Sequence, residues 1–136
     1  PYALGTAGYF HVMRGELEVG LPLLDRSISM SPCHPNWFHG AYVVDHLRRQ
    51  EFEEALHVVE RHHPYLGFWP AVVHGALLGR LGRIDEARNH LEDLEENKPD
   101  FPSRARELFR RTLKIDSIID DMIDGLCAAG MKTDAN

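Results

Sequence analysis

The clearest hydrophobic pattern in the chain lies close to its C-terminal end. Apolar side chains recur there at three- and four-residue intervals, which places them on one helix face, and aspartates fill the opposite face. The apolar positions are Ile115, Ile118, Ile119, Met122, Ile123 and Leu126. The pattern predicts a helix over 117–129. Asp116 or Ser117 is suited to cap its first amides, and Gly130 is suited to a left-handed C-terminal stop.

Further helices are predicted upstream, over 2–14, 17–30, 36–49, 52–62, 70–81, 84–97 and 103–113. Pro32 and Pro99 each follow one of these segments, as expected of a residue that cannot continue a helix. The stretch Pro64–Phe68 predicts a connecting loop, because proline and glycine interrupt the pattern there. The expected fold class is therefore all-α.

One short phrase occurs three times between these helices. Gly15-Glu16-Leu17-Glu18-Val19-Gly20 returns as Gln50–Ala55 and again as Gly82–Ala87, at offsets of 35 (from 15 to 50) and 32 (from 50 to 82) residues. These offsets bracket the period of about 34 residues of helix–turn–helix repeats. Small residues also fall at equivalent places, among them Gly8 and Gly20, where paired helices must approach closely.

These positions resemble the tetratricopeptide repeat family over roughly residues 2 to 99. The second copy departs from the pattern, since Gln50 replaces the turn glycine. The resemblance implies a right-handed α-α superhelix, which is a solenoid of three helical hairpins. Its expected divisions are repeats at 1–34, 35–67 and 68–99, C-terminal capping helices over 100–130 and a disordered tail over 131–136.

Four segments carry a narrower resemblance, namely 48–56, 79–87, 98–101 and 123–131. Together they are similar to the C-terminal repeat region of bacterial multidomain regulators, which carry a class III adenylate cyclase domain or a winged-helix domain upstream. The chain begins at Pro1 without an initiator Met. We therefore expect it to be part of a longer protein, and none of the cyclase or winged-helix residues is expected within it.

The family resemblance also implies a concave groove lined by the first helix of each repeat. The matching positions are Tyr2, Tyr9, Met13, Trp37, Val44, Leu47, Arg48, Trp69, Val72 and Arg80. Tryptophan, tyrosine and arginine dominate binding hot spots, so Trp37 and Trp69 are the expected anchors, with Arg48 and Arg80 selecting acidic neighbours. The alternative interpretation, in which these aromatic residues pack internally or against the terminal helices, stays open at this point.

Charge and composition reduce the number of function classes that fit the chain. A net charge of −6 argues against direct binding of nucleic acid. No apolar run approaches the roughly 20 residues of a membrane span. Cys33 and Cys127 form no paired motif, which fits a reducing, cytoplasmic setting.

The nine histidines suggest metal binding, with His39 and His46 as the closest pair and His57 near His62-His63, but no set of four ligands has suitable spacing. No catalytic motif is recognisable. We therefore expect no enzyme activity, metal or cofactor. The expected function is a non-catalytic protein–protein interaction scaffold that binds a protein or peptide within a larger bacterial regulator. The alternative is a self-association module, and thus a homo-oligomer, of a class III adenylate cyclase-type enzyme.

Overall fold

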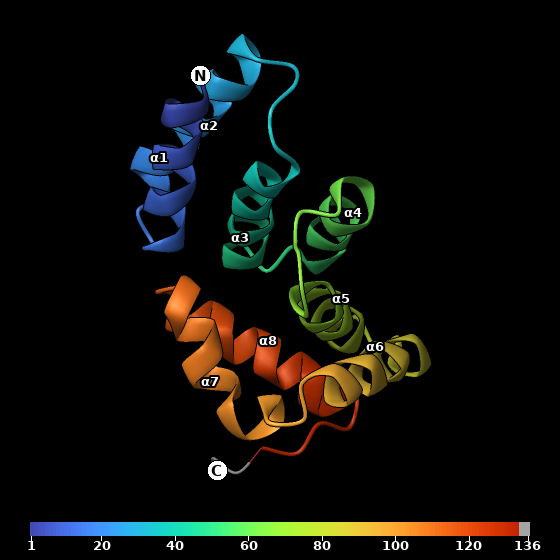
Figure 1. The fold of residues 1–136 in the computed structure, drawn as a ribbon. Coiled ribbons are helices and arrows are strands. Elements are labelled where there is room, and N and C mark those ends of the chain that lie inside the picture. Colours follow the sequence, from blue (N-terminus) through green and yellow to red (C-terminus); the bar gives the residue numbers. More distant parts are fainter. Residues whose placement is uncertain (134–136) are drawn as a thin grey trace. The chain divides into compact units, whose positions relative to one another are not determined.

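The computed structural model describes residues 1–133, and all their regular elements are helices (Figure 1). In order, the elements are α1 (Tyr2–Met13), α2 (Leu17–Met30), the 3₁₀-helix η1 (Asn36–His39), α3 (Gly40–Arg48), α4 (Phe52–His62), α5 (Trp69–Arg80), α6 (Ile84–Asn97), α7 (Phe101–Thr112) and α8 (Asp116–Ala128). The predicted all-α class is confirmed. The main difference concerns the helix expected over 36–49, which begins with a 3₁₀ turn and becomes α-helical only at Gly40.

The chain divides into two compact units. The first contains Pro1–Tyr65 together with the short segment Leu113–Ile115, and the second contains Leu66–Thr112 and the residues from Asp116 onward. The segment 113–115 belongs to the first unit because it contacts the end of α1, where the Lys114 amide donates a hydrogen bond to the Met13 carbonyl at 2.8 Å. That carbonyl is one of those left without a partner at a helix C-terminus.

In the first unit, α1 and α2 pack with their backbones in close approach. A Cβ atom at Gly8 would lie 2.7 Å from the Gly20 carbonyl oxygen, and one at Gly20 would lie 2.5 Å from the Gly8 carbonyl oxygen. Any larger residue would therefore force the two helices apart. The small residues expected at these two positions from the repeat pattern are confirmed as a contact between paired helices.

In the second unit, the closest backbone approach joins α5 to α8. A Cβ atom at Gly79 would collide with the Gly125 carbonyl group, and one at Gly125 would collide with the Ala76 carbonyl group. The predicted apolar face of α8 is buried here, with Ile118, Ile119, Met122 and Leu126 in the core. The sequence pattern predicted α8 but gave no sign of its partner.

The three copies of the repeated phrase form the same turn. In each copy an amide at the start of the second helix donates to a carbonyl five residues earlier: Glu16 to His11 at 2.8 Å, Glu51 to His46 at 2.9 Å and Arg83 to Leu78 at 2.9 Å. A carboxylate also reaches the histidine in the first two copies, at 2.9 Å between His11 and Glu16 and at 2.8 Å between His46 and Glu51. His11 and His46 therefore each form a hydrogen bond across the turn that follows their helix.

The residue before each turn amide has a positive φ: 90° at Gly15, 60° at Gln50 and 79° at Gly82. Gln50 thus occupies a left-handed conformation that normally favours glycine. Gly130 repeats the feature after α8, with φ at 115°, and the following Met131 amide donates to the Leu126 carbonyl at 3.0 Å. Met131 is buried, so the chain stays packed past the predicted start of the tail. The rest of that prediction, residues 134–136, lies outside the described residues.

Replacing Gln50 with glycine should stabilise the protein by about 0.5–1 kcal/mol, because it removes the cost of a side chain at positive φ. Gly82→Ala is the reverse test at the equivalent turn. Nothing lies within 4 Å of a Cβ atom at Gly82, so only the backbone conformation opposes the added methyl group. This variant should be destabilised by about 1 kcal/mol. Urea unfolding followed by circular dichroism measures both. A Gln50→Gly variant that is less stable than the parent contradicts this account of the turn.

Gly125→Ala should destabilise the second unit by about 2 kcal/mol or more, because the added methyl group meets the backbone of α5, which no side-chain movement can relieve. Cys127→Ala, at an exposed position two residues further along α8, is the control and should change stability little. Equal unfolding midpoints in urea for the two variants would show that α5 and α8 are not in close contact.

Candidate functional site

The structure places four of the predicted groove residues in the interior. Met13, Val44, Leu47 and Val72 are buried core residues. A buried side chain cannot contact a partner without rearrangement, so this part of the predicted groove lining is corrected to core.

The residues predicted from the third repeat are covered by helices of their own unit. The Trp69 ring lies 5.5 Å from the Phe109 ring of α7 and 4.8 Å from Phe68. The Arg80 guanidinium lies 3.7 Å from the Asp121 carboxylate and 3.9 Å from that of Asp124, both on α8. Burial raises the pKa of Asp121, whereas Arg80 opposes that rise. Trp69 therefore lies against a terminal helix, as the alternative interpretation allowed for the aromatic residues, and Arg80 lies beside the carboxylates of α8.

The predicted residues of the first two repeats, by contrast, come together. The Trp37 ring lies 4.9 Å from the Tyr9 ring and 6.3 Å from the Tyr2 ring, and meets both edge-on. Edge-to-face contacts at these distances are the favoured geometry of aromatic pairs. Phe10 and Phe38 complete the group, with ring centroids 6.5 Å and 4.7 Å from that of Trp37. We call these five residues the aromatic cluster.

The aromatic cluster has a buried base and an exposed top. Phe38 is fully buried, Tyr9 and Trp37 are half-buried, and Tyr2 and Phe10 are 61% and 53% exposed. Burial raises the pKa of the Tyr9 hydroxyl, so that tyrosine is neutral at physiological pH. The buried rings fix the exposed ones in place, and the result is a preformed aromatic surface.

From Tyr2 to Phe10, the exposed face of α1 around this cluster carries no acidic or basic side chain. Its exposed residues from position 2 to 10 are Tyr2, Ala3, Ala7 and Phe10. A surface helix of a globular protein ordinarily has a charged or polar outer face. Aromatic side chains flanking small ones on a neutral helix face are suited to receive another apolar segment.

Arg48, the remaining predicted groove residue, is exposed and already paired. Its guanidinium donates a hydrogen bond to the Asp45 carboxylate at 2.9 Å, and Arg49 binds the other oxygen of that carboxylate at 2.7 Å. An exposed pair of this kind contributes little stability. Its effect is to neutralise much of the charge that was expected to select acidic partners.

The histidines weighed as metal ligands in the sequence analysis have other partners in the structure. His46 binds Glu51, and His57 lies 3.7 Å from the Glu53 carboxylate. His39 instead contacts His34 and His62, two residues that sequence spacing gave no reason to combine with it. No group of three or more histidine, cysteine or acidic residues within residues 1–133 is arranged to hold a metal ion.

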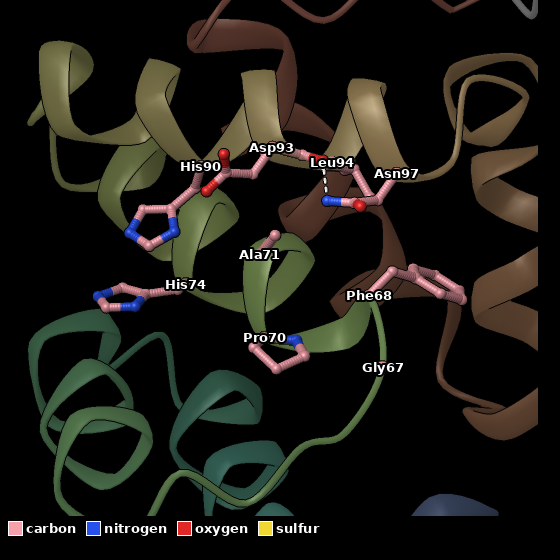
Figure 2. A pocket seen from close by; sticks show the side chains of 9 residues that line it. All are labelled: Gly67, Phe68, Pro70, Ala71, His74, His90, Asp93, Leu94 and Asn97. Atoms are coloured by element: carbon pink, nitrogen blue, oxygen red, sulfur yellow. Dashed lines mark hydrogen bonds between the residues drawn. The ribbon is translucent and has the colours of Figure 1, made fainter.

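A separate hollow of about 540 Å³ lies between α5 and α6 in the second unit (Figure 2). Figure 2 shows the His74 and His90 rings one above the other at one end of it, and their centroids lie 4.2 Å apart. Asn97 is held in the wall by a hydrogen bond from its amide to the Asp93 carbonyl at 2.8 Å. Among the described residues, its lining includes no hydroxyl or thiol side chain.

Two further observations bear on function. No helix in the described part of the chain combines the length and apolar character that crossing a bilayer requires. In comparisons with known proteins, no family model, curated protein or solved structure matches the chain. The aromatic cluster is therefore the feature of the chain that bears most directly on function.

Substitutions of buried and of exposed residues in the aromatic cluster should have different effects on the free energy of unfolding. Phe38→Ala should cost about 3–5 kcal/mol, because it empties a fully buried site. Phe10→Ala should cost about 0.5 kcal/mol or less, since that ring is 53% exposed. Urea unfolding gives both values, and a large loss for Phe10→Ala would place that residue in the core.

Proposed function

We propose that this chain is a non-catalytic protein-interaction module whose binding surface is the aromatic cluster of the first unit. The observation that carries the proposal is the neutral exposed face of α1, with Tyr2 and Phe10 held on buried aromatic neighbours. Preordered aromatic rings lose little conformational entropy when they bind, which is why they dominate hot spots.

The proposed partner is an apolar or aromatic segment of another protein, presented as a helix or an extended peptide. Arg48 and Arg80 each lie beside a carboxylate of this chain, so selection of acidic partners is not part of the proposal. The tetratricopeptide resemblance supports a module of this kind, since solenoids of that family bind other proteins along a concave face. A right-handed superhelix and a place within a bacterial cytoplasmic regulator belong to the same proposal.

A random displayed-peptide library, selected on the immobilised protein, tests this surface directly. Recovered peptides should carry aromatic or large aliphatic anchors. Phe10→Glu should weaken their binding at least tenfold, about 1.4 kcal/mol, because it replaces an exposed ring of the neutral surface with a charge. Calorimetry with the purified variant measures the loss.

Val19→Glu is the matched control, because Val19 is 52% exposed on α2, has a similar solvent exposure to Phe10 and is no member of the aromatic cluster. It should leave peptide binding unchanged. Failure to select any peptide, or an equal loss in the two variants, overturns the proposal. Sedimentation across a concentration range tests the alternative: a dimer that dissociates in Phe10→Glu but not in Val19→Glu would identify a second copy of this chain as the occupant.

A further inference from the structure

Three histidines from three segments meet beside η1 in the first unit. His34 lies in the connection after α2, His39 ends η1 and His62 ends α4. The Nε2 atoms of His34 and His39 are 2.8 Å apart, within hydrogen-bond distance. The His39 and His62 rings stack face to face, with centroids 3.6 Å apart and an interplanar angle of 3°. We call these residues the histidine cluster.

The histidine cluster is joined directly to the aromatic cluster. η1 has four residues, Asn36–His39, and Trp37 and Phe38 are two of them. The His34 ring also lies parallel to the Phe38 ring, with centroids 6.3 Å apart. Any displacement of His34 or His39 therefore moves the residues that support the exposed aromatic surface.

The hydrogen bonds of the histidine pair His34 and His39 can accommodate at most one added proton. The Nδ1 atom of His34 lies 3.0 Å from the Ser31 carbonyl oxygen, which can only accept, so this nitrogen carries a hydrogen. In neutral His34 the other nitrogen, Nε2, then accepts a hydrogen bond from Nε2–H of His39. One proton added to the pair can be shared in that bond. A second proton leaves two N–H groups facing each other, which is repulsive.

The surroundings add to this preference for neutral rings. Burial, the neighbouring His62 and His34, and the Arg61 guanidinium lower the pKa of His39 to about 4. Burial, Arg61 and His34 also lower the pKa of His62. The titratable and charged groups around the histidine cluster are Arg61 and His62 of α4, Tyr42 of α3 with Asp25 of α2 bound to it, and the Tyr9 and Tyr65 rings next to Gly40.

Asp25 is the acidic group bound to Tyr42, next to the histidine cluster. The Tyr42 hydroxyl donates to its carboxylate at 2.5 Å, and the Tyr42 ring centroid lies 5.7 Å from that of His39. Burial and this bond raise the pKa of the Tyr42 hydroxyl, which stays neutral. The carboxylate therefore does not contact the imidazole that would gain the proton.

We propose that the histidine cluster makes the aromatic surface sensitive to protons: protonation separates His34, His39 and His62, releases η1, and so disorders the support under Trp37. This inference rests on the proposed function only for the claim that partner binding then weakens. The structural release itself requires no partner. The device would couple recognition by the first unit to acidification.

The direction of the pH effect follows from the difference between the His39 pKa values in the closed and released forms. The ordinary pKa of histidine in an unfolded chain is about 6.5, and that of His39 in the folded cluster is about 4. Between these values the released form binds more protons than the closed form, so the closed form loses stability as pH falls through this range. Well above pH 6.5, His39 is neutral in the released form as well, so proton binding no longer disfavours the closed form.

Fluorescence of Trp37 tests the release without any partner. The background variant is Trp69→Phe, which leaves Trp37 as the only tryptophan, since the sequence has two. Its emission should shift to longer wavelength as pH falls from about 7 to about 4.5, because the ring becomes hydrated. Far-UV circular dichroism measured in parallel should keep its helical signal over the same range.

His39→Gln in this background should abolish the shift or move its midpoint by more than one pH unit. His57→Gln is the matched control, because His57 is exposed on α4 and pairs only weakly with Glu53. It should reproduce the parent curve. Should His39→Gln prove unfolded at pH 7.5, His34→Gln supplies the same test, since it removes the other partner of the 2.8 Å contact.

An unchanged shift in both His39→Gln and His34→Gln overturns the inference, and so does a parent protein that shows no shift before its helices unfold. Binding of a selected peptide, measured at pH 7.5 and pH 5, then tests the link to function. Affinity that falls at least tenfold in the parent but not in the cluster variant supports it. A fluorescence shift without any selected peptide would overturn the proposed function while leaving the release intact.

Discussion

Close contact between helix backbones is the constraint on which both units depend. Gly8 meets Gly20 between α1 and α2, and Gly79 meets Gly125 between α5 and α8. At each place a single Cβ atom would occupy the space of a neighbouring carbonyl group, so the helices can approach only because no side chain intervenes. Once α1 lies on α2, Phe38 can be buried near Gly5 of α1, and the aromatic cluster follows from that burial.

The aromatic and histidine clusters share one short element, and this explains why η1 is not a regular α-helical turn. It has to present Trp37 toward α1, bury Phe38, and hold His39 against His34 and His62. The tighter winding of a 3₁₀ turn gives side chains three residues apart the same direction, so His39 follows Asn36 on one side while the two aromatic residues point elsewhere. A single short segment thereby links polar and aromatic packing in the first unit.

Sequence predicted much of the fold because local rules decide most of it. The helices and their repeated turns follow from apolar spacing and from Gly15 and Gly82, whose positive φ values are 90° and 79°. The pairing of α8 with α5 could not be predicted, because Gly79 and Gly125 are distant in sequence and glycine alone does not name its partner. For the candidate site, Tyr2, Tyr9 and Trp37 were correctly brought together, whereas Val44, Leu47 and Val72 carry no signal that separates a groove from a core. The contact of His34 with His39 depends on the path of the connection after α2, which spacing does not determine.

The path of the chain has a consequence for dissecting the protein. Because Leu113–Ile115 belongs to the first unit while the helices on either side belong to the second, the backbone passes between the units three times. A fragment ending at Tyr65 would lack the Lys114 amide that satisfies the Met13 carbonyl. The first unit is therefore not a contiguous stretch of polypeptide, and neither is the second. A chain cut near residue 65 would still have Leu113–Ile115 of the first unit covalently joined to the second unit.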